Sequence, residues 1–172
     1  LVLLIPHIYN TGISTSGMST SITNPRVERA VEAFNDHDPD RLMAEMAEGS
    51  TFTDPLEEAI TGTELHQYTA EIFEAFPDIR LEVDRVISGT GGVTAIEGTY
   101  AGTHEGPIQG IPARGRSVAV PTMTVIDVSD RGITSWRDYW DQQTFSDQLG
   151  LSFPDILPLV PKIVAAKVRD SV

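Results

Sequence analysis

Several residue types and patterns are missing from this sequence, and each absence excludes a class of protein. The chain of 172 residues has no cysteine, so it can form no disulfide, no thiolate metal site and no cysteine nucleophile. No apolar run reaches the roughly 18 residues of a membrane-spanning helix. The initial "LVLLI" lacks the basic segment of a secretory signal and stops at Pro6. We therefore expect a cytoplasmic protein that does not contact a membrane.

Common catalytic motifs are absent too. The four histidines fit no paired metal-ligand spacing. There is no phosphate-binding loop, no G-x-G-x-x-G after a strand and no G-x-S-x-G elbow. The sequence therefore predicts no metal site, and it disfavours nucleotide binding and covalent serine chemistry.

Basic residues are scarce, which bears on partners and on origin. Asp and Glu number 25 against 12 Lys and Arg, giving a net charge of −13 and a pI near 4.5. Such a surface repels phosphate backbones, so no nucleic-acid partner is expected. The only lysines are Lys162 and Lys167. Excess carboxylate with few lysines is typical of proteins from salt-rich cytoplasm, although an ordinary acidic protein is the alternative.

The length and composition favour one domain, which we place at residues 24–151. Residues 1–23 are interpreted as an irregular N-terminal extension; within it, Met18 begins a stretch typical of a natural start. Residues 152–172 form a proline-broken tail that is expected to end in a short helix.

Helix signals fill the first half of the domain. Asn24-Pro25 and Asp38-Pro39 each place a capping side chain before a proline at the first helical position. The second helix is expected to include Met46 and to end at Gly49. Thr61 and Glu64 have the spacing of a capping box and start a third helix.

Strand signals follow the helices. "STFTDPL" (50–56) reads as a short strand, and almost all of 79–141 alternates or is rich in β-branched residues. Helices followed by a meander of strands indicate an α+β fold. We expect three N-terminal helices packed in a strongly curved mixed or antiparallel sheet, which forms a cone-shaped α+β barrel with an internal pocket.

The segment "ITSWRDYWD" carries the first candidate catalytic residue. On a strand, Trp136, Asp138 and Trp140 share one face. If that face points inward, desolvation raises the pKa of Asp138 toward the range useful for acid–base catalysis. The alternative is that the tryptophans merely pack and Asp138 pairs with an arginine.

Four other residues could contribute to a site. Asp141 is the rival carboxylate, although its position suits a helix cap. His104 and Tyr100 share a face if their strand stays regular, and either could donate to an oxygen; a structural role for the lone His104 is the alternative. Asp54, after Phe52, could point into the pocket or form a turn with Pro55.

Three segments together resemble a known family. They are "AFPDIRLEV" (75–83), "GTYAGTHEGPIQGIPARGRSV" (98–118) and "DRGITSWRDYWDQQTFSDQLG" (130–150). They resemble the SnoaL-like polyketide cyclase, or ester cyclase, family of the nuclear transport factor 2-like superfamily, over about 25–151. The shared pattern is Phe-Pro-Asp, Gly-Thr-His-x-Gly, Gly-x-Pro-x-x-Gly-Arg and a last strand that ends in Asp before Gln-Leu-Gly.

The resemblance implies cofactor-free aldol cyclisation, isomerisation or lyase chemistry on a small apolar carbonyl or polyketide-type compound. It implies a carboxylate on the last strand as acid/base: Asp138 first, Asp141 second. His104 matches the family's histidine, and Tyr100, Trp136, Trp140, Phe52 and Asp54 are the expected substrate contacts.

Related epoxide hydrolases use an Arg-x-Asp on an earlier strand, where this chain reads "EGTYAGTH", so epoxide hydrolysis is disfavoured. A homodimer or higher homo-oligomer is expected. The same fold could instead serve as a non-catalytic module that binds a small ligand or builds a dimer.

Overall fold

The first two helices begin where their capping residues predict. The structure is a computed structural model that describes residues 18–152 together with 156 and 160. Asn24 accepts a hydrogen bond from the Arg26 backbone N–H at 3.0 Å and caps α1 (Pro25–Asn35). Asp38 accepts one from the Arg41 N–H at 2.9 Å and caps α2 (Pro39–Glu45). Both predicted helix starts are confirmed.

The third helix begins where expected but without the predicted capping box. In α3 (Gly62–Ala75), Thr61 is the N-cap residue, yet its side chain makes no capping hydrogen bond. The chain enters the helix through Gly62 at φ +52°, a left-handed conformation that a capping box does not contain. The capping-box prediction is therefore wrong, although the helix is present.

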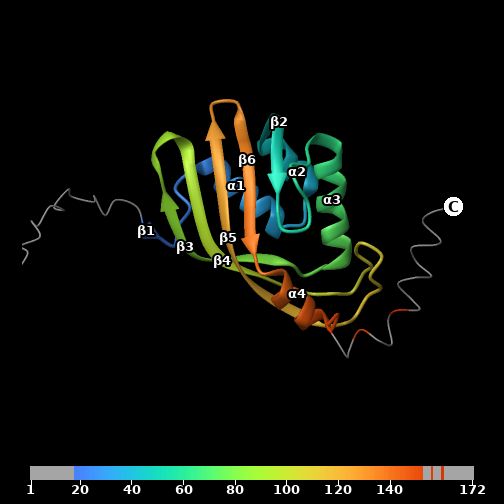
Figure 1. The fold of residues 1–172 in the computed structure, drawn as a ribbon. Coiled ribbons are helices and arrows are strands. Elements are labelled where there is room, and N and C mark those ends of the chain that lie inside the picture. Colours follow the sequence, from blue (N-terminus) through green and yellow to red (C-terminus); the bar gives the residue numbers. More distant parts are fainter. Residues whose placement is uncertain (1–17, 153–155, 157–159, 161–172) are drawn as a thin grey trace, which may run out of the picture.

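The strands form one mixed sheet in the order β1-β3-β4-β5-β6-β2. Neighbours pair antiparallel except β2 and β6, which are parallel. Because β1 and β2 lie at opposite edges, the sheet does not close; the predicted barrel is an open, curved sheet (Figure 1). The strands are β1 (Met18–Ser19), β2 (Met46–Thr53), β3 (Arg80–Ser88), β4 (Val93–Thr103), β5 (Ser117–Ser129) and β6 (Gly132–Trp140).

The boundary between α2 and β2 differs from the prediction. The helix ends at Glu45, and the strand begins at Met46 rather than Ser50. Met46 pairs with Ile133 of β6, so a tertiary contact converts residues that were expected to be helical into an edge strand.

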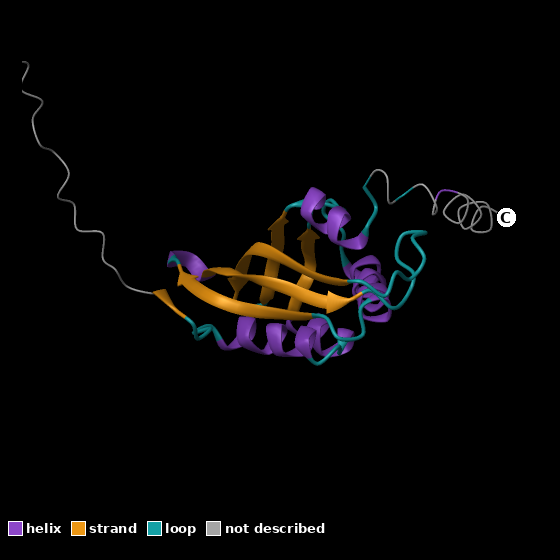
Figure 2. Cartoon of the chain, turned by 90° about the horizontal axis from the view of Figure 1, so that it is seen from below, coloured by secondary structure: helices purple, strands orange, loops and turns teal. Residues whose placement is uncertain are grey.

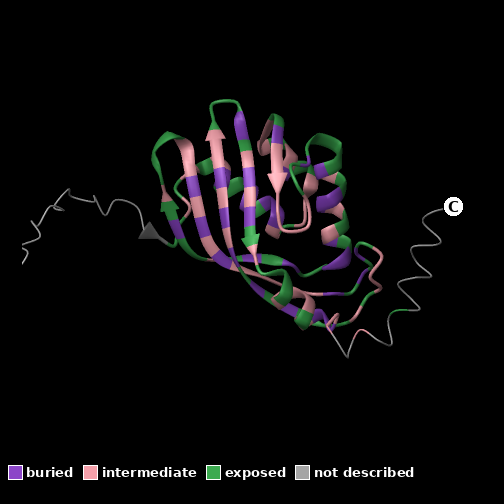
Figure 3. Cartoon of the chain, in the orientation of Figure 1, coloured by how far each residue is buried: buried purple, intermediate pink, exposed green. Residues whose placement is uncertain are grey.

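Helices and the curved sheet enclose the core between them. In Figure 1, α1 and α2 lie behind the sheet and α3 lies beside β2, and Figure 2 shows the curvature of the strands from below. A short helix, η1 (Thr90–Gly92), joins β3 to β4, and α4 (Gln142–Leu149) follows β6. Buried and exposed residues alternate along the strands (Figure 3). One face of the sheet therefore packs against the helices.

Predictions for the two ends of the chain fall mostly outside the described residues. Met18–Ser19 lies within the stretch that was expected to be irregular, yet it pairs with β3. Residues 1–17 and nearly all of the expected tail helix at 152–172 lie outside the part of the chain that the structure describes.

Candidate active site

A cavity of about 100 Å³ lies between the sheet and the helices. Its walls are apolar apart from two carboxylates, Asp54 and Asp138, and a few hydroxyl groups. None of the described residues that line it is Lys, Arg or His. Its aromatic wall residues are Phe34, Phe52, Tyr68, Phe76, Tyr100, Trp136, Trp140 and Phe145.

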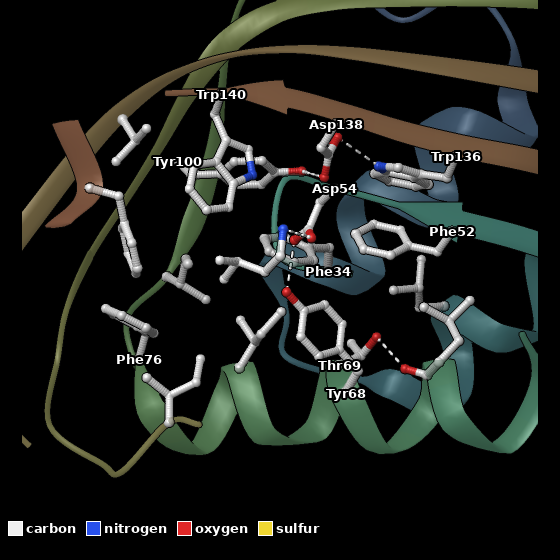
Figure 4. Close-up of a pocket in the computed structure, with 18 of the residues that line it drawn as sticks. Phe34, Phe52, Asp54, Tyr68, Thr69, Phe76, Tyr100, Trp136, Asp138 and Trp140 are labelled. Carbon is white, nitrogen blue, oxygen red and sulfur yellow. Dashed lines mark hydrogen bonds between the residues drawn. The ribbon is translucent and has the colours of Figure 1, made fainter. Parts of the chain in front are cut away.

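Asp138 lies on β6 with its side chain inside this cavity and is 6 % exposed. Thr124 donates a hydrogen bond to Oδ1 at 2.6 Å, and the Trp136 indole N–H donates to the same oxygen at 3.0 Å. The Tyr100 hydroxyl donates to Oδ2 at 2.9 Å (Figure 4). All three donors are neutral, so the carboxylate is held in place without a cationic partner.

Burial raises the pKa of Asp138 from 3.8 to about 6. The hydrogen bonds from Thr124, Tyr100 and Trp136 act in the opposite direction, because they stabilise the charged form. The negative charge of Asp54 adds to the rise. A carboxyl group with this pKa is well placed to accept and return a proton near neutral pH.

Asp54 reaches the cavity because its strand is in register with β6. Phe52 pairs with Trp136 and Thr53 with Arg137 in the parallel ladder. The next residues on the two sides are therefore Asp54 and Asp138, which lie beside each other. Its Oδ1 accepts from the backbone N–H groups of Leu56 and Glu57 at 2.8 and 2.7 Å. This confirms the turn that Asp54-Pro55 predicted, and Asp54 lines the cavity as well.

Tyr68 of α3 completes the Asp54 end of the cavity. Its hydroxyl donates to Asp54 Oδ2 at 2.7 Å (Figure 4), and its ring lies 5.8 Å from that of Phe52. Burial, together with the nearby carboxylates, raises the pKa of Tyr68, so this phenol remains a hydrogen-bond donor.

The structure brings most of the predicted site residues together. Trp136, Asp138 and Trp140 share the inward face of β6, as the alternation predicted, and Tyr100, Phe52 and Asp54 line the same cavity. No arginine in the described part of the chain pairs with Asp138; Arg137 points to the other face and bonds Asp127 at 2.8 Å.

His104 lies outside the lining of the cavity. It is fully buried and stacks on Phe76, with ring centroids 5.0 Å apart. The strand β4 ends at Thr103, so the alternation that would have placed His104 beside Tyr100 stops one residue too early. Burial lowers the pKa of His104, which favours a neutral imidazole packed behind the cavity wall.

Asp141 also lies outside the lining of the cavity. Its Oδ1 accepts from the Thr144 backbone N–H at 2.6 Å and caps α4. That hydrogen bond lowers the pKa of Asp141. The capping alternative for Asp141 is confirmed.

Two groups around the carboxylates were missed by the sequence reasoning. Thr124 sits in a β-branched run, where nothing distinguishes a hydrogen-bond donor from a packing residue. Tyr68 lies within the third predicted helix, and its hydroxyl could be matched to a carboxylate only from the fold. Their partners lie on other elements, on β6 for Thr124 and just after β2 for Tyr68, 14 residues away in each case.

Within the described residues there is no cluster of His, Asp or Glu that could hold a metal ion. Nor does that part of the chain contain a helix long and apolar enough to cross a membrane.

The open curved sheet, the helices packed on one face and the interior cavity with a buried carboxylate define an α+β protein of the nuclear transport factor 2-like class. The family model for the SnoaL-like polyketide cyclases matches residues 25–149. The chain belongs to that family. No protein of curated function matches the sequence at a significant level.

Solved structures confirm the fold. A candidate polyketide cyclase from Xanthomonas campestris pv. campestris is 22% identical with a TM-score of 0.66, covering 73% of this chain and 94% of the other. AclR, a candidate hydroxylase from Streptomyces galilaeus, is 18% identical with a TM-score of 0.66, covering 74% and 95%. A protein with a ketosteroid isomerase-like fold from Catenulispora acidiphila, in complex with trimethylamine, is 22% identical with a TM-score of 0.65, covering 76% and 96%.

Proposed function

We propose that this protein is a cofactor-independent cyclase or isomerase in which Asp138 transfers a proton at the carbon next to a carbonyl group. The observation that carries the proposal is a carboxylate that is buried in an apolar cavity, has a pKa raised to about 6 and is bonded only to neutral donors. Family membership supports a reaction of this class.

The proposed reaction begins when the Asp138 carboxylate takes the α-proton. The C–H bonding electrons pass into the carbonyl system and give an enolate. The protonated Asp138 then returns the proton to a different carbon in an isomerisation, or to the alkoxide formed by an intramolecular aldol addition. The apolar walls exclude water, which would otherwise quench the enolate.

Tyr100 is the proposed donor to the enolate oxygen. Its hydroxyl bonds Asp138 at 2.9 Å, and that bond weakens as Asp138 becomes neutral. The O–H can then turn to the new negative charge, whose stabilisation is usually a large part of catalysis. Since His104 does not line the cavity, Tyr100 is the better placed of the two donors considered from the sequence.

The test is exchange of α-protons for deuterium in small aryl ketones such as propiophenone, followed by NMR in deuterium oxide. Asp138→Asn should slow the enzyme-dependent exchange by about a hundredfold or more, because the base is removed while the side-chain shape is kept. Asp130→Asn, the same substitution in the exposed turn between β5 and β6, is the matched control.

Asp141→Asn separates the two carboxylates that the sequence proposed. Asparagine is itself a good N-cap, so α4 should persist and exchange should continue. Exchange that survives Asp138→Asn but is lost in Asp141→Asn would reverse the assignment. Unchanged exchange in Asp138→Asn would remove Asp138 from the mechanism.

The non-catalytic alternative expected Asp138 to be neutralised by a fixed cation such as an arginine. The described residues around the cavity supply none. This arrangement favours a reactive carboxyl group over one that is locked in an ion pair.

A further inference from the structure

The cavity holds two acidic side chains and no basic one among the described residues that line it. Each carboxylate accepts three hydrogen bonds, all from neutral groups: Asp138 from Thr124, Trp136 and Tyr100, and Asp54 from Tyr68 and two backbone N–H groups. Asp138 is buried and Asp54 is half-buried, and negative charge that is withdrawn from water without a counter-charge is costly. Among the described residues that line the cavity, no positive charge offsets these two carboxylates.

The aromatic walls of the cavity are suited to binding a positively charged group. Phe52 and Tyr68 lie beside Asp54, with ring centroids 5.8 Å apart, and Trp136 and Trp140 flank Asp138 on β6. Aromatic faces attract cations, tryptophan most strongly, and they do so best where water is excluded. Figure 4 shows these rings around the two carboxylates.

The hydrogen bonds that Asp54 already accepts restrict which kinds of cation are suited to binding beside it. With Oδ1 occupied by two N–H groups and Oδ2 by the Tyr68 hydroxyl, the carboxylate needs a positive charge more than it needs further donors. An ammonium nitrogen whose hydrogens are replaced by methyl groups supplies charge without donors. Its methyl groups also fit apolar and aromatic walls.

We propose that the substrate carries a methylated ammonium group, which binds at the Asp54 end of the cavity against Phe52 and Tyr68. This deepens the proposed function and rests on it for the place of the reacting carbon, which is at Asp138. The two carboxylates then have separate tasks: Asp54 recognises the charge of the substrate and Asp138 moves its proton. An anionic substrate meets two carboxylates and no cation, so the same cavity excludes it.

The test compares three probes of the same shape and different charge by isothermal titration calorimetry. They are choline, its neutral isostere 3,3-dimethylbutan-1-ol and the anion 3,3-dimethylbutanoate. Choline should bind about tenfold more tightly than the alcohol, and the anion should not bind detectably. If choline binds no more tightly than the alcohol, or does not bind, the inference is wrong. This comparison needs only the unmodified protein.

Two substitutions locate the preference. Asp54→Asn keeps a carbonyl oxygen to accept from the Leu56 and Glu57 N–H groups, so the turn should persist while the charge is lost. The advantage of choline over the alcohol should then disappear. Asp130→Asn, in the distant turn, should keep the advantage. A preference for choline that is equally strong in Asp54→Asn would place the cation elsewhere and contradict the proposal.

The two proposals fail in different ways. Asp138→Asn should abolish α-proton exchange while much of the preference for choline remains. Binding of choline without exchange in the unmodified protein would overturn the proposed reaction and leave the charge recognition standing. Exchange of the α-protons of a neutral ketone, without any preference for choline, would support the proposed reaction and overturn the proposed charge recognition.

Discussion

At the scale of single residues, the Asp138 side chain is fixed in position while its negative charge is disfavoured. Three neutral donors fix its position, yet burial makes its ionised form unfavourable and raises its pKa to about 6. A buried carboxyl group of this kind weakens the folded state at pH values where it is ionised. That cost can be measured.

Asp138→Asn should make the protein more stable at neutral pH. The pKa of Asp138 is about 6 in the folded protein against an ordinary value of 3.8, so the folded state holds the proton more tightly than the unfolded state does. The stability of the unmodified protein should therefore fall as pH rises from about 4 to 6, by about 3 kcal/mol in all. Asparagine does not titrate, so its advantage should grow over that range. Urea unfolding at several pH values measures this difference.

Asp141→Asn gives the opposite pH dependence and serves as the control. The helix cap lowers the pKa of Asp141, so its contribution is present above its ordinary pKa and is lost as pH falls. The disadvantage of this variant should thus shrink toward low pH. A stability difference for Asp138→Asn that stays flat from pH 4 to 7.5 would mean that the carboxyl is not perturbed.

At the scale of elements, local chemistry predicted where helices start, whereas tertiary contacts determine where α2 gives way to β2 and where β4 ends. Asn24, Asp38 and Asp141 cap their helices as their sequence neighbours indicate, because a cap involves residues two or three apart. The change at Met46 from helix to strand depends on Ile133, and the position of His104 depends on where β4 ends. Neither can be derived from a local pattern.

The candidate site likewise has one part that the sequence predicts and another part that only the fold reveals. Alternation along one strand was enough to place Trp136, Asp138 and Trp140 together. Pairing Asp54 with Tyr68 required knowing that α3 packs beside the end of β2, and pairing Asp138 with Thr124 required the register of the β5–β6 ladder. Residue spacing therefore predicted which residues share the inward face of β6, but it could not predict which residues of other elements bond to them.

The loop between β4 and β5 depends on a close contact at Gly106. A Cβ added there would lie 2.4 Å from the Glu74 carbonyl oxygen, and the Gly106 N–H bonds the Ala75 carbonyl at 3.0 Å. Gly106→Ala should thus push the loop away from α3, lowering the unfolding free energy by roughly 1–3 kcal/mol. The loop also carries Ile108 to the cavity wall, so choline affinity should fall as well.

Gly49→Ala is the comparison for this loop. An added Cβ at Gly49 meets nothing within 4 Å, and the cost is confined to its φ of +73°, about 1 kcal/mol. Choline affinity should be unchanged. Equal effects of the two substitutions on stability and on binding would show that Gly106 is not a packing constraint.

At the scale of the whole molecule, the net charge of −13 should make stability depend on salt. Self-repulsion among 25 acidic residues is relieved when salt shortens the range of electrostatic interactions to about 3 Å at 1 M. We expect the melting temperature to rise by several degrees between 0.1 and 2 M potassium chloride. Differential scanning fluorimetry measures it, and 2 M sucrose tests for a general co-solute effect. A melting temperature that falls with salt would contradict the expectation.

The parallel pairing of β2 with β6 also fixes when the cavity can come into being. Phe52 and Trp136, which are partners in that ladder, are separated by most of the domain, and contacts between such distant segments form slowly. As the ribosome releases the chain, Asp54 and its turn emerge long before the strand that carries Asp138. The nascent protein can fold α1, α2 and α3 before β6 emerges, but it cannot bring the two carboxylates together until that last strand docks.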